Sequence, residues 1–142
     1  MSNDPVGTLA LGSGLLEPLF LKHGFAYRTL DAGSSSGGPF ASGEFRKDNR
    51  WLELHFRHSL GMVTYHLGSR SMSHQEYMRS VLGRAYASHY PGFSSDPIDA
   101  FRHLYLDLGE HGAVFLEGTD DNLLHCMEDA QAQRSDRLVL PE

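Results

Sequence analysis

A change in hydrophobic period near residue 70 constrains this chain more than any other feature of its sequence. Between residues 40 and 67 apolar and polar side chains alternate, which is the pattern of strands with one buried face. The segment 51–58 shows the alternation most clearly, with Leu52, Leu54 and Phe56 on one side and Trp51, Glu53, His55 and Arg57 on the other. From residue 73 onward apolar residues recur at helical spacing instead. The chain therefore predicts a sheet followed by helices.

The alternating part of the chain divides into four predicted strands, at 25–30, 40–46, 51–58 and 62–67. The connections between them are too short for parallel crossovers, so we expect antiparallel pairing in chain order. A glycine- and serine-rich loop, 31–39, joins the first two strands.

Helix signals flank the predicted strands on both sides. A leucine-rich helix precedes them, and because proline is tolerated in the first helical turn, Pro18 predicts that this helix begins near Leu15 or Glu17. Three helices follow, signalled by the capping box from Ser73 to Glu76, by Asp96-Pro97, and by a segment from Thr119 to about residue 133.

These elements predict one α+β domain over residues 1–142. Its expected architecture is a four-stranded antiparallel meander, with an N-terminal helix and three C-terminal helices packed mainly on one face. Residues 1–7 and 135–142 are expected to be flexible ends.

Charge and composition exclude several classes of function. The formal net charge is −6, which disfavours nucleic-acid phosphates and favours a basic protein partner. Cys126 is the only cysteine, so a disulfide framework and a cysteine-based zinc site are excluded. We expect a cytoplasmic protein, because the sequence shows neither a signal peptide nor an apolar run long enough to span a membrane.

The polar side of the predicted sheet is the strongest candidate for a functional site. If Leu60-Gly61 is a two-residue turn, His55 lies opposite His66, and a four-residue turn at 47–50 sets further pairs. The resulting surface would hold Glu44, Arg46, Trp51, Glu53, His55, Arg57, Thr64 and His66.

Three interpretations of this surface remain open. It can be a solvated sheet face stabilised by cross-strand pairs. It can be a partner-binding surface, with Trp51 and Arg57 as anchors, or the interface of a homo-oligomer. It can also be a site for a divalent metal such as zinc, held by His55, His66 and Glu53.

A second polar group follows Pro97 on the predicted third helix. Asp99, His103, Asp107 and Glu110 or His111 recur every three or four residues, which favours ion pairs on a wet helix face over a metal or acid–base site. The chain has no G-x-S-x-G, H-E-x-x-H or P-loop motif. Catalysis is therefore not expected.

Several segments between residues 20 and 110 carry a resemblance to other proteins. They are Gly43–Phe45, Leu52–Gly61, Tyr65-His66, His74-x-x-Tyr77-Met78 and Tyr90-Pro-Gly-Phe93-x-x-Asp96-Pro97. Together they resemble a group of small bacterial α+β proteins without an assigned activity. Their general build is similar to that of immunity proteins of bacterial toxin systems. The negative charge, the missing catalytic motifs and the surface around Trp51, His55, Arg57 and His66 predict a non-enzymatic protein-binding module without a cofactor. The similarity of build to immunity proteins suggests one that neutralises a toxin. The alternative is a small metal-binding protein or metal-dependent enzyme.

Overall fold

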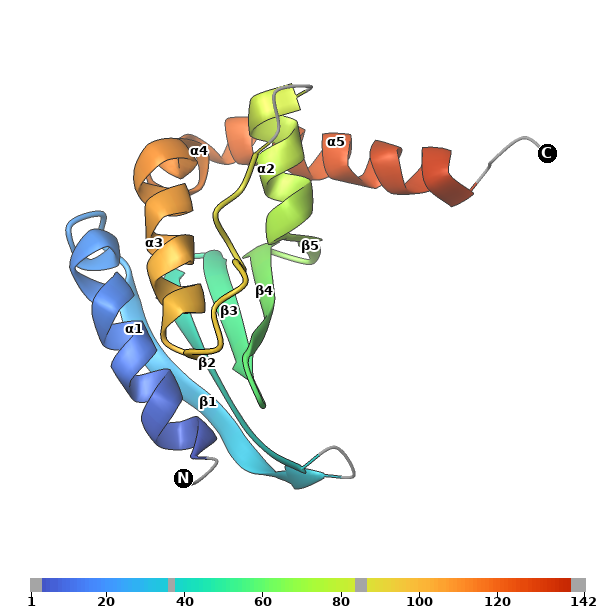
Figure 1. Ribbon diagram of the computed structural model, residues 1–142. Coiled ribbons are helices and arrows are strands. Elements are labelled where there is room, and N and C mark those ends of the chain that lie inside the picture. Colours follow the sequence, from blue (N-terminus) through green and yellow to red (C-terminus); the bar gives the residue numbers. More distant parts are fainter. Residues whose placement is uncertain (1–3, 36–37, 84–86, 139–142) are drawn as a thin grey trace.

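A computed structural model describes residues 4–35, 38–83 and 87–138 of the chain (Figure 1). Its strands are β1 (Ala26–Ser35), β2 (Gly38–Lys47), β3 (Arg50–Phe56), β4 (Leu60–Leu67) and β5 (Arg70–Ser73). Its helices are α1 (Pro5–Leu21), α2 (His74–Leu82), α3 (Asp99–His111), α4 (Ala113–Leu116) and α5 (Asp120–Leu138). The strands form one antiparallel sheet in the order β1-β2-β3-β4-β5.

The α+β class and the antiparallel meander are therefore confirmed, but the predicted number of elements is wrong. The described residues contain a fifth strand, and four helices follow it instead of three. The sequence hides β5 because it spans only four residues after the turn at Gly68-Ser69, too few to show an alternation. It hides α4 because this helix is a single turn.

The first helix begins ten residues earlier than Pro18 had indicated. Asp4 is its N-cap and accepts a hydrogen bond from the Gly7 amide, and Pro5 occupies the first helical turn. Pro18 lies inside the helix on an exposed position, as does Gly14 four residues before it. Water can therefore solvate the carbonyl that the missing proline N–H leaves without a partner.

Parts of both ends that were expected to be flexible belong to helices. Residues 5–7 belong to α1, and 135–138 belong to the last turns of α5. Residues 1–3 and 139–142 lie outside the described part of the chain.

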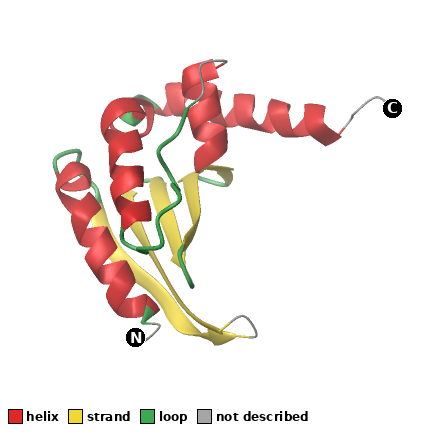
Figure 2. Ribbon diagram, in the orientation of Figure 1, coloured by secondary structure: helices red, strands yellow, loops and turns green. Residues whose placement is uncertain are grey.

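The helices pack against one side of the sheet (Figure 2). In β3 the burial alternates residue by residue, and Leu52, Leu54 and Phe56 are buried as the sequence predicts. Their side chains join a single hydrophobic cluster with residues of α1, α2, α3 and α5. Stacked aromatic rings fill its centre, with Tyr65 and Tyr77 4.6 Å apart between ring centroids. The opposite side of the sheet has no helix on it among the described residues.

Two cations at one end of the sheet satisfy the last carbonyls of α4. Arg50 is buried, and its Nη1 donates to the Phe115 carbonyl at 2.8 Å, while Lys47 Nζ donates to the Leu116 carbonyl at 3.2 Å. Arg50 also forms an ion pair with Asp120 in the first turn of α5. The β2–β3 turn thereby holds the junction between α4 and α5 by charge as well as by packing.

Helix α1 contacts α3 closely because Gly12 has no side chain. A Cβ atom at position 12 would lie 2.4 Å from ring carbons of Phe101, a buried residue of α3. Gly14, on the solvent side of the same helix, has no such neighbour within 4 Å.

We therefore predict opposite effects for two alanine substitutions in α1. Gly12→Ala should lower the free energy of unfolding by about 1–3 kcal/mol, because the gain in helix propensity is smaller than the cost of overpacking. Gly14→Ala, the matched control, should raise it by roughly 0.5–1 kcal/mol. Chemical denaturation of the three proteins measures both values. Equal effects of the two substitutions would contradict the described contact.

Candidate functional site: the uncovered sheet face

The pairing of strands decides which polar side chains meet on the uncovered face. Between β2 and β3, Arg46 pairs with Trp51 and Glu44 with Glu53, so this half of the prediction is confirmed. Between β3 and β4 the prediction is wrong, because Trp51 pairs with His66 and His55 pairs with Met62.

The error arises at the turn between β3 and β4. Leu60 belongs to β4, and the turn is formed by residues 57–59, where the Arg57 amide donates to the Ser59 carbonyl. A bulge between His55 and Phe56 adds a further shift. Since the register differs from the predicted one by an even number of residues, every side chain keeps its predicted face and only its neighbour changes.

The correct register builds a stack across three strands. The Arg46 guanidinium of β2 lies 4.0 Å from the centroid of the Trp51 ring of β3. The His66 ring of β4 stacks on Trp51, with centroids 4.6 Å apart and planes 5° apart. His66 Nε2 lies 2.9 Å from a Glu53 carboxylate oxygen, which fixes the orientation of the imidazole. The indole is therefore held between a cation and an imidazole.

Glu44 lies beneath this stack and does not present its charge to solvent. Its side chain is 3% exposed and accepts hydrogen bonds from Arg28 at 3.0 Å and from Arg46 at 2.8 Å. Two guanidinium groups thus neutralise the buried carboxylate. The expectation that Glu44 contributes an accessible acidic group is wrong, because its neighbours on β1 and β2 cover it.

A second group of side chains lies further along the same face. The Arg57 guanidinium lies 5.5 Å from the centroid of Phe40, and its Nη1 donates to the Gly38 carbonyl at 2.6 Å. His55 stacks on the same Phe40 ring, with centroids 5.5 Å apart. Arg28 and Phe40 were not predicted for this face. Phe40 alternates with Glu44 and Arg46, so the pattern of the second predicted strand would have placed it there, whereas no register was predicted for the strand that holds Arg28.

The two histidines predicted to share a metal therefore belong to different groups. His66 contacts Trp51 and Glu53, whereas His55 contacts Phe40 and lies opposite Met62. Within the described ranges, no three histidine, cysteine or acidic side chains are arranged to hold a metal ion. The His55–His66–Glu53 geometry on which the metal alternative depended is not formed.

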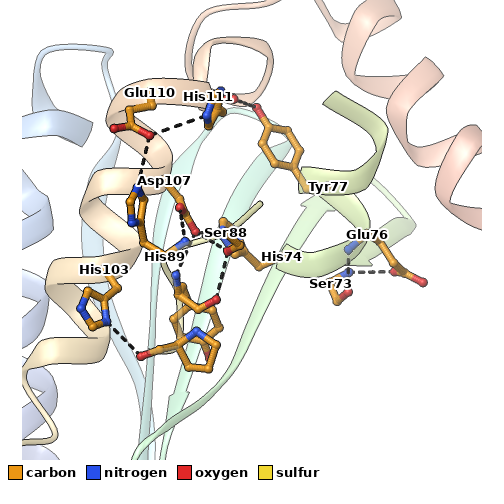
Figure 3. Close-up of polar contacts among 12 residues, drawn as sticks. Ser73, His74, Glu76, Tyr77, Ser88, His89, His103, Asp107, Glu110 and His111 are labelled. Carbon is orange, nitrogen blue, oxygen red and sulfur yellow. Dashed lines mark hydrogen bonds and ion pairs between the residues drawn. The ribbon is translucent and has the colours of Figure 1, made fainter. Parts of the chain in front are cut away.

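The polar residues of α3 form a different arrangement from the one their spacing predicts. Figure 3 shows Asp107 directed into the protein, where it is 1% exposed. Its carboxylate accepts hydrogen bonds from His74 Nε2 at 2.8 Å, Ser88 Oγ at 2.6 Å, and the amides of His89 at 2.8 Å and Tyr90 at 3.1 Å. It thus joins α2, α3 and the segment 88–90, and the predicted wet ion-pair ladder is wrong at this position.

The other members of the predicted ladder stay near the surface. Asp99 pairs with Arg102, and His103 Nδ1 lies 3.1 Å from the Pro91 carbonyl. Glu110 lies between His89 and His111, at 3.4 Å and 3.6 Å from their Nε2 atoms (Figure 3).

Hydrogen bonding sets the charge state of the buried group. Burial alone would raise the pKa of Asp107, but the bonds from His74, Ser88 and the two amides outweigh it and lower the pKa to about 2. Tyr65 lies 2.6 Å from His74 Nδ1, and burial raises the pKa of its hydroxyl well above the usual value. The Tyr65 hydroxyl therefore stays protonated, and the His74 ring lies between it and the Asp107 carboxylate.

A third surface was not predicted and consists of apolar residues on α1 and α3. Leu11, Leu15, Tyr105 and Leu106 are each at least 39% exposed. A hollow of about 350 Å³ lies between the two helices, lined by Leu15, Pro18, Arg102, Tyr105 and Leu106. Helical spacing groups Tyr105 with the buried Phe101, Leu104 and Leu108 of α3, because spacing alone does not show how wide a buried stripe is.

The fold and the uncovered face define this chain as an α+β protein with a two-layer arrangement and one exposed sheet surface. It matches no family model, and no curated protein and no solved structure is significantly similar to it. None of the described helices is long and apolar enough to cross a membrane.

The Asp107 network predicts a specific dependence of stability on pH. A carboxyl whose pKa falls from 3.8 to about 2 on folding stabilises the protein fully above pH 4 and loses this contribution as the pH falls towards 2. The shift corresponds to about 2 kcal/mol. Asp107→Asn should therefore be destabilised by about 2 kcal/mol or more at pH 7, and its deficit should shrink in acid.

Urea denaturation of both proteins between pH 7 and pH 2 measures this dependence. Glu110→Gln, which alters an exposed carboxyl of the same helix, serves as the control and should change stability little. A deficit of Asp107→Asn that stays constant over this pH range would contradict the assigned charge state.

Proposed function

We propose that this chain is a non-enzymatic protein-binding module that contacts its partner through the uncovered face of the sheet. The stack of Arg46, Trp51 and His66 carries this proposal. Tryptophan and arginine are the residue types that contribute most to binding at protein interfaces. Here both are held in place before any partner arrives, so binding would cost little side-chain entropy.

The remaining polar groups support binding over catalysis. The network of Asp107, His74 and Tyr65 is sealed from solvent, so a substrate cannot reach it. Burial raises the pKa of the Cys126 thiol, which disfavours the reactive thiolate. The uncovered face instead presents rings and guanidinium groups that contact one another on a broad surface.

The charges of the face favour a partner that presents carboxylates or carbonyls there. Arg28 and Arg46 are 66% and 39% exposed at their side chains, whereas Glu44 is covered. Two further carboxylates belong to this face: Glu53, which is bonded to His66, and Asp31 on the edge strand β1. The net charge of −6 can still speed the approach of a basic protein at long range. The uncovered face itself, however, exposes arginines more than it exposes acidic side chains.

Neutralisation of a protein toxin is the more specific form of this proposal. It rests on the resemblance of the sequence to a group of small bacterial proteins whose general build is similar to that of immunity proteins. A module of this kind would act by covering a surface of the toxin, which requires tight binding and no catalysed reaction.

Affinity purification with the tagged chain from its native cells tests the proposal. Wild type should retain a protein partner that is lost with Trp51→Ala and with Arg57→Ala, each of which should weaken binding by roughly tenfold or more. Glu128→Lys on the exposed side of α5 is the matched control and should bind normally. Circular dichroism confirms that each variant is folded. A partner retained equally by all four proteins would place the binding surface elsewhere.

A further inference from the structure

Strand β1 has an unpaired edge along its whole length. It is the terminal strand of the sheet and pairs only with β2. The β1–β2 pairs continue to Ser35 and Gly38, whereas pairing of β2 with β3 stops at Ala41. The hairpin therefore projects past the other strands (Figure 1), and residues 28–34 are exposed.

A backbone donor near the middle of this edge is bonded only locally in the contacts of β1. The Ala32 amide donates to the exposed side chain of its own neighbour, Asp31, at 2.8 Å, which directs this N–H towards the open side of β1. An incoming strand would replace this bond with one to its own carbonyl. Free edges of this kind readily accept a further strand, and β1 contains no lysine or proline to prevent it.

A bulge places the two charges of β1 on the same face. The register shifts between Thr29 and Asp31, so Arg28 lies opposite Glu44 and Asp31 lies opposite Ser42. Because Glu44 and Ser42 are two residues apart on β2, their partners Arg28 and Asp31 face the same way despite being three residues apart. They are the only charged residues between 26 and 35.

This arrangement is complementary to itself. When two copies of β1 run antiparallel, only the register with Arg28 opposite Asp31 of the other copy brings unlike charges together. Two-fold symmetry then forms the same pair twice. Arg28 is 66% exposed and uses one of its five N–H groups to bind Glu44, so the others remain available to reach across the edge.

We propose that β1 pairs antiparallel with β1 of a second copy of this chain, with Arg28 of each copy opposite Asp31 of the other. The pairing would join the two sheets into one and would cover Leu30, which is 40% exposed beside the bulge. A two-fold axis that pairs antiparallel edges is perpendicular to the sheet, so both uncovered faces lie on the same side. The dimer would thus present two copies of the partner-binding surface side by side.

Sedimentation velocity over a range of protein concentrations tests the proposal. Wild type should reach a mass near twice 15.8 kDa. Asp31→Lys sets like charges opposite each other twice and should raise the dissociation constant by roughly tenfold or more. Glu128→Lys makes the same charge change on α5 and should leave the dimer intact. Ala32→Pro removes the outward N–H and should also give monomers, whereas Ala32→Ser should not.

Each result decides the proposal once circular dichroism shows that the variants are folded. A wild type that stays monomeric at the highest concentration rejects it. A dimer that survives Asp31→Lys rejects the register, and one that survives Ala32→Pro rejects pairing through β1. In the last case the apolar surface of α1 and α3 is the alternative interface, to be tested with Leu11→Ser.

Discussion

Helices cover one face of the sheet and leave the other to water, and the contacts of both faces follow from this asymmetry. On the covered face β3 contributes Leu52, Leu54 and Phe56 to the hydrophobic cluster. On the other face the side chains have no helix to pack against, so they pack against one another. The stack of Arg46, Trp51 and His66 and the contacts of Phe40 are the result.

Buried charges on the helical side serve the connections between elements. Asp107 collects two side-chain donors and two amides, and it holds the segment before α3 against α2. Arg50 and Lys47 likewise donate hydrogen bonds to the carbonyls at the end of α4. In each case a charge meets backbone groups that would otherwise lack partners. These groups are therefore structural, and the accessible polar chemistry is left to the uncovered face.

The exposed edge and the uncovered face belong to the same sheet, which links the two proposals. A strand added at β1 extends the sheet without covering the rings and guanidinium groups of β2, β3 and β4. Assembly and partner binding can therefore take place together, and a dimer would gain from binding a partner at two sites. Because the β1 edge and the uncovered face are separate surfaces, the chain could bind a partner without forming a dimer, or form a dimer without binding a partner.

Local patterns in the sequence determined the class of the fold and the faces to which the residues of β3 and β4 belong. Alternation fixes a side chain's face because successive residues of a strand point in opposite directions, and the capping box at Ser73 and Glu76 fixes the start of α2. The neighbours across strands were decided by the tertiary structure. The turn and the bulge between β3 and β4 place His66 opposite Trp51, whereas the predicted register placed it opposite His55. The alternation of buried and exposed residues is the same in both registers, so it could not distinguish them. Burial of Asp107 was also decided there. Its spacing on α3 suits a wet surface equally well, and only the tertiary structure brings its donors, from α2 and from segment 88–90, beside it.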